Sequence, residues 1–394
     1  MKRIIFICSL ILLNVNVMAQ YYKGDNYQVT FEDDFDSDNR TWADSTFIES
    51  ENVWRAYFYG KKLTHGECER QVYQASQCVF DSDNGLAKLV ADYIGPQITC
   101  EDIVKPTVPD TVKCEDWELD LFNIQYFSGA LVSVNYGNYY HKYKYGYFEI
   151  RCKLPVHQGA FPAFWLWDCK NAEDDTVKFY EEIDIFEYSW GIAKDTPNSN
   201  GPDDNRCFTT GIYYNETGDS DSLTFLYSYG KAFTRVPDSS PSMDEWNTFG
   251  CLWLPDRVEW YINDIKVNSY YNSDYIPKHP MHIKANYAIN SDLDDIDSFE
   301  EYTLSDTMFI DYIRVYQPIC DCETNVLIDS QSDLNNYEPG VKRTVTINSS
   351  SSTPIIVSSQ NYVSIIASEQ IVIDKPFKVN TGAKFEAVIQ QCPN

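Results

Sequence analysis

Residues 181–188 read Glu-Glu-Ile-Asp-Ile-Phe-Glu-Tyr, an apolar β-type run that carries acids in the pattern E-x-D-x-x-E. Side chains alternate between the two faces of a regular strand, so Glu182 and Asp184 would share one face and Glu187 would point to the other. A β-bulge near residues 185–186 would take up one residue and return Glu187 to the first face. We therefore expect a bulged strand that presents its carboxyl groups on one side.

The expected spacing of the two glutamates resembles that of a pair of catalytic acids. With the bulge, the Cα atoms of Glu182 and Glu187 would lie roughly 13 Å apart and their carboxyl groups about 5 to 6 Å apart. Retaining glycosidases hold two carboxyls about 5 to 5.5 Å apart, so that one attacks the anomeric carbon while the other protonates the departing oxygen. Asp184 adds negative charge between them, which keeps a proton on one acid at neutral pH. A solvated acidic strand and a calcium site remain alternatives for this run.

Short strands also flank the acidic run. Residues 147–154 alternate between apolar and mostly polar positions, which predicts a half-buried strand. Residues 257–262 and 265–267 flank Asn263 and Asp264, two residue types that tolerate the positive φ of a tight hairpin turn. Sustained helical periodicity is absent from this part of the chain. The pattern predicts an all-β, concanavalin-like jelly-roll sandwich, in which one sheet curves into a concave face for a long polymer.

The two ends of the chain differ from this central part. Residues 1–19 begin with basic residues and continue into the apolar run Ile4–Leu13, the layout of a secretory signal peptide. That run is shorter than the roughly 20 residues that cross a bilayer, so we expect an exported protein without membrane insertion. The jelly roll is predicted to occupy residues 20–318. Residues 319–394 are rich in Ser, Asn and Thr with short Val/Ile runs, which predicts a small accessory β module.

The charge and the cysteines limit the partners and the compartment. A formal net charge of −28 repels phosphate backbones and anionic lipid, so nucleic acid and membrane surfaces are excluded as partners. The chain has 12 cysteines, all but Cys8 beyond the signal segment, and export would place them where disulfides form. With no C-x-x-C pair and only 5 histidines, zinc is a poor interpretation of these positions. We expect disulfides and buried thiols.

Several separated motifs accompany the acidic run in a fixed order. Together they resemble glycoside hydrolase family 16 over roughly residues 25 to 317, and this combination is far more specific than the acidic pattern alone. The motifs are Glu-Arg-Gln-Val-Tyr at 69–73, Phe-Ser-Gly-Ala-Leu at 127–131, Tyr-Gly-Tyr-Phe-Glu-Ile-Arg at 145–151, Gly-Ala-Phe-Pro-Ala-Phe-Trp-Leu at 159–166, Trp-Asn-Thr-Phe-Gly at 246–250, Trp-Leu-Pro-Asp at 253–256 and Ile-Asp-Tyr-Ile-Arg-Val-Tyr at 310–316.

The resemblance implies a jelly roll that cuts internal β-linkages of a β-1,3-glucan or a β-linked galactan, with retention of configuration through a glycosyl-enzyme intermediate. By the same match Glu182 would be the nucleophile and Glu187 the acid/base, while Asp184 would hydrogen-bond the nucleophile and tune its protonation. No cofactor is implied for catalysis. We expect a secreted monomer, located in the periplasm, at the cell surface or outside the cell, whose partner is a polysaccharide.

The resemblance also suggests binding positions. Trp165 and Trp190 would stack on sugar rings, although buried tryptophans are commonly core residues. Tyr213 and Asn286 would complete the substrate contacts. A structural calcium ion on the convex face, away from the chemistry, would match Asp34, Gly85 and Asp311, and plain surface acids are the alternative there.

Some positions depart from the family pattern. Phe161 replaces the usual Trp before a proline, Phe186 stands where laminarin-cleaving relatives often carry Met, and Tyr213 stands where many relatives have His. The sequence therefore leaves the polysaccharide and its linkage open. Two alternatives to hydrolysis also remain, a non-catalytic carbohydrate-binding jelly roll and a transglycosylase.

Overall fold

The computed structural model describes most of the strand-forming sequence. It covers residues 27–36, 54–56, 69–95, 124–133, 141–157, 159–170, 178–188, 206–217, 227–289, 305–319, 321–335, 337, 341–348, 353–358, 362–374, 377–381 and 383–389. Within these ranges, no helix is long and apolar enough to cross a membrane. The signal segment predicted at residues 1–19 lies outside the described residues.

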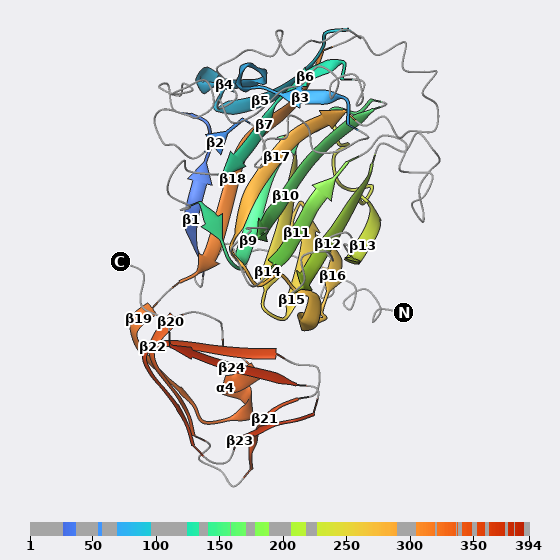
Figure 1. Ribbon diagram of the computed structural model, residues 1–394. Helices are drawn as coiled ribbons and strands as arrows, with labels where there is room; N and C mark the ends of the chain where they lie inside the picture. Colours follow the sequence, from blue (N-terminus) through green and yellow to red (C-terminus); the bar gives the residue numbers. More distant parts are fainter. Residues whose placement is uncertain are drawn as a thin grey trace, which may run out of the picture.

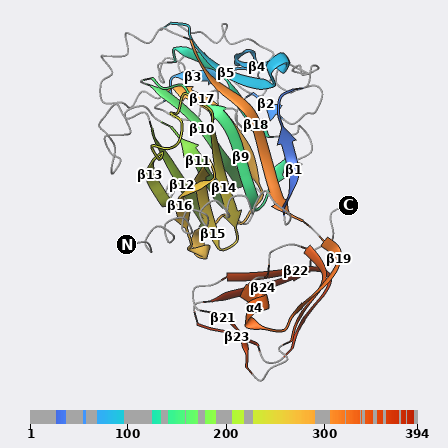
Figure 2. The ribbon, with the colours of Figure 1, turned by 180° about the vertical axis from the view of Figure 1, so that it is seen from behind.

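Two large sheets face each other, as Figures 1 and 2 show. The first, which carries the acidic run, has 8 strands in the order β13-β12-β11-β10-β17-β7-β2, with β8 paired to β17. Its pairings are all antiparallel among the described residues. The bounds are β2 (Trp54–Arg55), β7 (Ala130–Ser133), β8 (Lys142–Tyr143), β10 (Ala160–Lys170), β11 (Lys178–Glu187), β12 (Cys207–Thr217), β13 (Tyr227–Arg235) and β17 (Met281–Ile289).

The second sheet has 10 strands in the order β16-β15-β14-β9-β18-β5-β6-β3, with β1 on β18 and β4 on β5. The two sheets confirm the predicted all-β sandwich. The bounds are β1 (Tyr27–Asp33), β3 (Gln71–Tyr73), β4 (Cys78–Asp81), β5 (Leu86–Tyr93), β6 (Tyr126–Ser128), β9 (Gly146–Lys153), β14 (Asn247–Leu254), β15 (Arg257–Ile262), β16 (Ile265–Tyr270) and β18 (Asp306–Pro318), with short 3-10 turns η1 (Ala75–Gln77), η2 (Ser82–Asn84) and η5 (Ser273–Tyr275).

A hydrophobic core fills the space between the sheets. Alternate residues of β9, from Phe148 to Cys152, enter it, as the sequence predicts. The other face of β9 is also covered, because Tyr147 packs against Tyr261 and Tyr316 from flanking strands. The prediction of a half-buried strand is therefore wrong for Tyr147 and Glu149, which are buried because long aromatic side chains of neighbouring strands shield the centre of the sheet from water, and right for Arg151 and Lys153, which stay partly exposed.

The hairpin between β15 and β16 forms where the sequence places it. Asn263 has φ +47° and Asp264 has φ +65°, the two successive positive values of a tight hairpin turn. The side chain of Asn263 accepts a hydrogen bond from the backbone N–H of Thr248 at 2.9 Å. This contact attaches the turn to β14, and the predicted hairpin is confirmed.

The last strands form a separate parallel sheet in the order β19-β20-β22-β24, joined to the sandwich through the end of β18 (Figures 1 and 2). A second parallel pair, β21 with β23, faces a core that contains Ile328, Val345 and Ile347. Strands that return in parallel on two faces form a short β-solenoid. The bounds are β19 (Asp321–Ile328), α4 (Gln331–Asn335), β20 (Val341–Ile347), β21 (Ile355–Val357), β22 (Tyr362–Ile373), β23 (Phe377–Val379) and β24 (Lys384–Ile389).

Candidate active site

The acidic run forms β11 and contains the predicted bulge. Asp184 lies opposite Gly211 of β12, but the next paired residue is Glu187, opposite Thr209. The side chains of Ile185 and Phe186 are both buried in the core between the sheets, and the Phe186 ring lies 4.4 Å from that of Phe249 on β14. Because two successive apolar side chains face inward, Glu187 returns to the face of Glu182 and Asp184.

This face lines a cleft that brings together most of the predicted site. The walls consist of Glu69, Phe161, Ala163, Trp165, Glu182, Asp184, Glu187 and Asn286. All three predicted acids are present, together with the predicted Trp165 and Asn286. Glu69, from the segment before β3, is a fourth carboxyl group that the sequence had not assigned to the site.

Strand register arranges the cleft face in rows that run across β17, β10, β11 and β12. A polymer crossing the strands would run along such a row. The rows are His282, Trp167, Glu182 and Tyr213; then Lys284, Trp165, Asp184 and Gly211; then Asn286, Ala163, Glu187 and Thr209.

The carboxyl group of Glu182 is buried and its acidity is perturbed. Burial, which disfavours the charged form, raises its pKa from 4.5 to about 7, and the charge of Glu187 contributes in the same direction. A hydrogen bond from the Tyr180 hydroxyl to Oε2, at 2.5 Å, and the positive charge of Lys284 act against this rise. Glu182 therefore titrates near neutral pH together with its neighbours.

The other two acids have different partners. The hydroxyl of Thr209 donates a hydrogen bond to Oε2 of Glu187 at 3.2 Å. The backbone carbonyl of Asp184 accepts a hydrogen bond of 2.7 Å from the indole nitrogen of Trp260, which lies on β15 of the opposite sheet. Glu187 is only partly buried. The backbone just before the bulge is anchored from the core side by the hydrogen bond from Trp260.

A chain of hydrogen bonds positions Trp165 in the cleft. Its indole nitrogen donates to Oδ1 of Asn286 at 2.7 Å, and the Asn286 amide donates to the Tyr73 hydroxyl at 3.0 Å. The Gln71 amide also donates to Tyr73, at 3.0 Å, and to the Glu69 carboxylate at 2.5 Å. The alternating residues of the 69–73 motif therefore connect directly to a residue predicted to bind sugar.

A family model described as Glycosyl hydrolases family 16 matches residues 107–313, more than half of the chain. The chain belongs to glycosyl hydrolase family 16. One similar protein is endo-1,3-1,4-β-glycanase ExsH of Rhizobium meliloti (strain 1021). It is 28% identical over 174 residues, which are 44% of this chain and 30% of that protein. A second, endo-1,3-1,4-β-glycanase EglC of the same organism, is 31% identical over 123 residues, or 31% of this chain and 20% of that protein. The chain thus spans less than a third of the length of either relative.

Solved structures share the fold of this family 16 chain. A Bacteroides ovatus mixed-linkage-glucan family 16 protein in complex with a G4G4G3G product matches with a TM-score of 0.50 and 19% identity, over 73% of this chain and 100% of that chain. A β-porphyranase from Bacteroides plebeius matches with a TM-score of 0.50 and 17% identity, over 77% of this chain and 98% of that chain. At these identities the similarity shows the jelly-roll fold alone.

Lys284 is a cleft residue of this family 16 chain that sequence reasoning missed. Its Nζ lies 4.0 Å from the ring centroid of Trp165 and 3.8 Å from that of Trp167, so the ammonium is held between two aromatic faces. The side chain is only 2% exposed. The available signal was period-two alternation in 281–289, where the polar His282, Lys284 and Asn286 alternate with apolar residues and so share one face.

The other predicted substrate contacts have different outcomes. Tyr213 faces the cleft opposite Glu182. Its pKa is raised above the usual value by burial first, and then by the charges of Asp184 and Glu187, so its hydroxyl keeps its proton in this acidic surrounding. Trp190 lies outside the described residues, and its stacking role stays a prediction.

The predicted calcium residues lie away from the cleft. The carbonyl oxygen of Asp34 is 3.4 Å from the place where a Cβ on Gly85 would stand, so these two residues adjoin. The carboxylate of Asp311 already pairs with the guanidinium of Arg151, and a calcium ion would compete with this partner. The described residues contain no group of three or more His, Cys, Asp or Glu that could hold a metal. Calcium binding stays a prediction.

Among the described cysteines, Cys78, Cys152, Cys207 and Cys251 are buried thiols that form no disulfide. Burial raises the pKa of the Cys78 thiol to about 12, which makes it unreactive at neutral pH. Cys322, at the start of β19, is disulfide-bonded. The buried thiols behave as small apolar core residues.

Proposed function

We propose that this chain is an exported, retaining endo-β-glycosidase that hydrolyses internal β-linkages of a polysaccharide of the β-1,3-glucan or β-galactan type. The observation that carries the proposal is the bulge in β11, which places Glu182 and Glu187 in one cleft on the same face. The layout of residues 1–19 supports export. The names of the two Rhizobium relatives support a β-glycan as the substrate class.

The groups around Glu182 suggest which glutamate is the nucleophile and which is the acid. Two closely coupled carboxyls share a proton near neutral pH, because the ionisation of one disfavours that of the other. The Tyr180 hydroxyl and the Lys284 cation both favour negative charge on Glu182. In the free protein the raised pKa of about 7 belongs to Glu182, which therefore holds the shared proton part of the time near neutral pH. For the reaction, the proton passes to Glu187, as acid, and the charge rests on Glu182, as nucleophile.

Hydrolysis then follows in two displacements. A carboxylate oxygen of Glu182 forms a bond to the anomeric carbon while the glycosidic C–O bond breaks, and Glu187 transfers its proton to the departing oxygen. Glu187, now ionised, takes a proton from a water molecule, whose oxygen attacks the anomeric carbon and releases Glu182 as carboxylate. Two inversions at one carbon return the original configuration.

The cleft has surfaces that suit a neutral sugar chain. Trp165, fixed by Asn286, and Phe161 offer apolar ring faces, and sugar rings stack on such faces while their hydroxyls bond to polar edges. Asp184 lies between the glutamates along the strand and would keep the nucleophile oriented. The row arrangement across four strands would allow a long polymer to pass through the site, as endo-action requires.

The test compares the wild-type protein with Glu182→Gln on laminarin, mixed-linkage glucan, agarose, porphyran, carrageenan and poly-lactosamine glycans, following new reducing ends. We expect oligosaccharides from the wild type on at least one glycan, and a loss on the order of 10⁴-fold in the variant. Proton NMR of the first product should show the retained anomer, and products longer than the substrate would reveal transglycosylation.

The neighbouring acid provides a matched control. Glu181 is fully buried outside the cleft and accepts hydrogen bonds from the backbone N–H groups of Lys278 and His279 at 2.9 and 2.8 Å. Glu181→Gln should therefore keep its cleavage activity. Wild-type binding to a glycan without cleavage, unchanged in Glu182→Gln, would replace the proposal with a carbohydrate-binding function.

A further inference from the structure

Tyr180 lies two residues before Glu182 and shares its face of β11. Its hydroxyl donates a hydrogen bond of 2.5 Å to Oε2 of Glu182, the short length typical of a bond to an ionised carboxylate. The ring of Trp167, on β10, packs edge-on against the Tyr180 ring at 6.3 Å and 77°. The hydroxyl is therefore aimed at the carboxylate by a ring that is itself held in place.

In this hydrogen bond Tyr180 is the donor and Glu182 is the acceptor. Burial, followed by the adjacent negative charge of Glu182, raises the pKa of Tyr180 far above its usual value, so the phenol remains protonated and acts as the donor. A donor of this kind stabilises the ionised form of its acceptor more than the protonated form. Tyr180 therefore favours the state of Glu182 that can attack a sugar.

Other groups around Glu182 act on the same proton. Glu187 and Asp184 come from its own strand, Tyr213 from β12, and Lys284 from β17. His282 occupies the same row as Glu182, and burial together with nearby cations lowers its pKa to about 3, so it is neutral at the pH of interest. Tyr180 donates its hydrogen bond of 2.5 Å to Oε2 of Glu182, and Asp184 is a second hydrogen-bond partner of the same carboxyl group.

We propose that Tyr180 is a positioning residue for the nucleophile: its hydroxyl orients the carboxylate of Glu182 and directs the shared proton to Glu187. The proposal rests on the function proposed above. A purely structural role is the alternative, since the Tyr180 ring also packs on Trp167. The two roles separate in Tyr180→Phe, which keeps the ring and removes only the hydroxyl.

The experiment titrates the glutamates of [δ-¹³C]Glu-labelled full-length protein by NMR, with Glu182→Gln assigning the Glu182 resonance. In Tyr180→Phe the pKa of Glu182 should rise by about one pH unit, since a hydrogen bond to a charged group is lost. The acidic limb of the kcat/KM profile should move upward by the same amount, so kcat/KM at pH 6 falls about tenfold. KM should change little.

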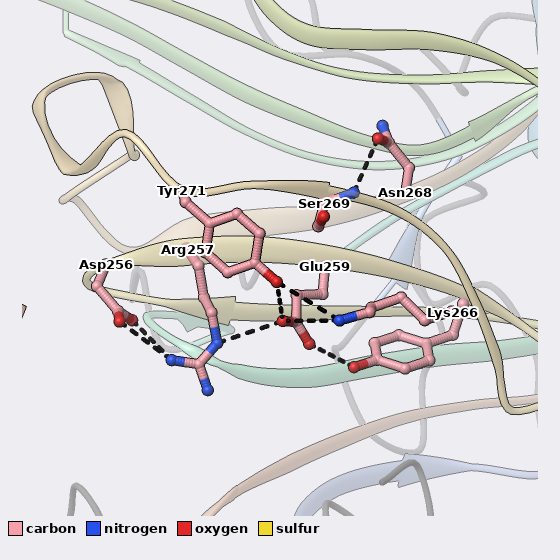
Figure 3. A network of polar contacts seen from close by, with 8 residues as sticks. Asp256, Arg257, Glu259, Lys266, Asn268, Ser269 and Tyr271 are labelled. Atoms are coloured by element: carbon pink, nitrogen blue, oxygen red, sulfur yellow. Dashed lines mark hydrogen bonds and ion pairs between the residues drawn. The ribbon is translucent and has the colours of Figure 1, made fainter. Parts of the chain in front are cut away.

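A second tyrosine–glutamate pair supplies the control. In the polar network of Figure 3 the Tyr271 hydroxyl donates to Oε1 of Glu259 at 2.8 Å, on the β15–β16 side of the other sheet. Tyr271→Phe should leave both the Glu182 titration and the pH profile unchanged. An unmoved pKa of Glu182 in Tyr180→Phe would overturn the proposal.

The two proposals fail in different ways. A wild type that cleaves no glycan, combined with a raised Glu182 pKa in Tyr180→Phe, would overturn the glycosidase function and still support control of the Glu182 proton by Tyr180. An active wild type whose Glu182 pKa and pH profile are the same in Tyr180→Phe would retain the glycosidase and reduce Tyr180 to a packing residue.

Discussion

At the scale of single residues, the site is a balance around one carboxyl group. Burial and the charge of Glu187 raise the pKa of Glu182, whereas the Tyr180 hydrogen bond and the Lys284 charge lower it. The opposing effects leave the pKa of Glu182 at about 7. Near this value, small changes in the surroundings on sugar binding can add a proton to Glu182 or remove it. A group placed in this way costs folding stability, as functional groups often do.

That cost can be measured as a function of pH. The folded protein holds the Glu182 proton more tightly than the unfolded chain, so its stability falls as pH rises from about 4.5 through about 7. Glu182→Gln cannot ionise and should escape this loss. In urea unfolding at pH 8 we expect the variant to be more stable than wild type by about 1 to 3 kcal/mol. At pH 4 the difference should vanish, and equal stability at both pH values would contradict the interpretation.

A second measurement at this scale concerns the repulsion between the glutamates. Because the charge of Glu187 raises the pKa of Glu182, removing it in Glu187→Gln should lower the Glu182 pKa. NMR titration of the labelled variant would show the Glu182 resonance moving to a lower midpoint. A midpoint that stays near 7 would mean that burial alone sets the value.

The sequence predicted the acids of the site but not their supports. Glu182, Asp184 and Glu187 lie within one strand, so period-two alternation and a bulge are enough to place them together. Glu69 and Lys284 come from distant segments, and their position depends on which strands become neighbours and in which register. Local patterns do not contain that information.

At the scale of elements, β11 is attached to the opposite sheet by Trp260. Its indole nitrogen donates a hydrogen bond to the backbone carbonyl of Asp184, immediately before the bulge. Trp260→Phe would leave this buried carbonyl without its donor, which we expect to cost about 1 to 3 kcal/mol of stability. Activity should fall as well, because the bulge that presents Glu187 loses its anchor.

Trp253 is the matched control for this prediction. It is also fully buried in the second sheet, and its indole donates to the carbonyl of Pro277 at 3.1 Å. Trp253→Phe should lower stability by a similar amount in urea unfolding while kcat per folded molecule stays at the wild-type value. Equal losses of kcat in both variants would show that the Asp184 contact has no special role.

Elements whose structure depends only on their own residues could be predicted from the sequence. The Asn263–Asp264 turn was predictable because both residue types accept positive φ. The first half of the outer face of β9 was misjudged, because the burial of Tyr147 depends on aromatic side chains from strands about 100 residues or more away in sequence, such as those carrying Tyr261 and Tyr316.

At the scale of the whole molecule, two sets of core residues are separate in sequence. The core of the sandwich draws on residues up to Val315, whereas that of the solenoid begins at Ile328. We therefore expect two transitions in calorimetry of the full chain. Ile347→Ala, which opens a cavity in the solenoid, should destabilise one of them by about 2 to 5 kcal/mol. A shift of both transitions together would show that the chain unfolds as one unit.

In the C-terminal region, strands were predictable but their direction was not. Short Val/Ile runs predict β structure, yet the same runs fit antiparallel hairpins or parallel coils equally well. Parallel pairing of β19, β20, β22 and β24 requires the chain to return over a second face, where β21 and β23 lie.

The bulge of β11 also restricts how the length of this strand could change in evolution. Deleting Ile185 would give a regular strand in which Glu182, Asp184 and Glu187 still alternate onto the cleft face, with one core side chain fewer. Inserting a residue at the same place would also give an even spacing, so in a regular strand the last glutamate would stay on the cleft face, but about 6 to 7 Å farther along the strand than after the deletion. Descendants of this chain could therefore shorten the strand by one residue and keep the two glutamates close together, whereas a one-residue insertion would keep them on one face but move them farther apart than a retaining pair allows.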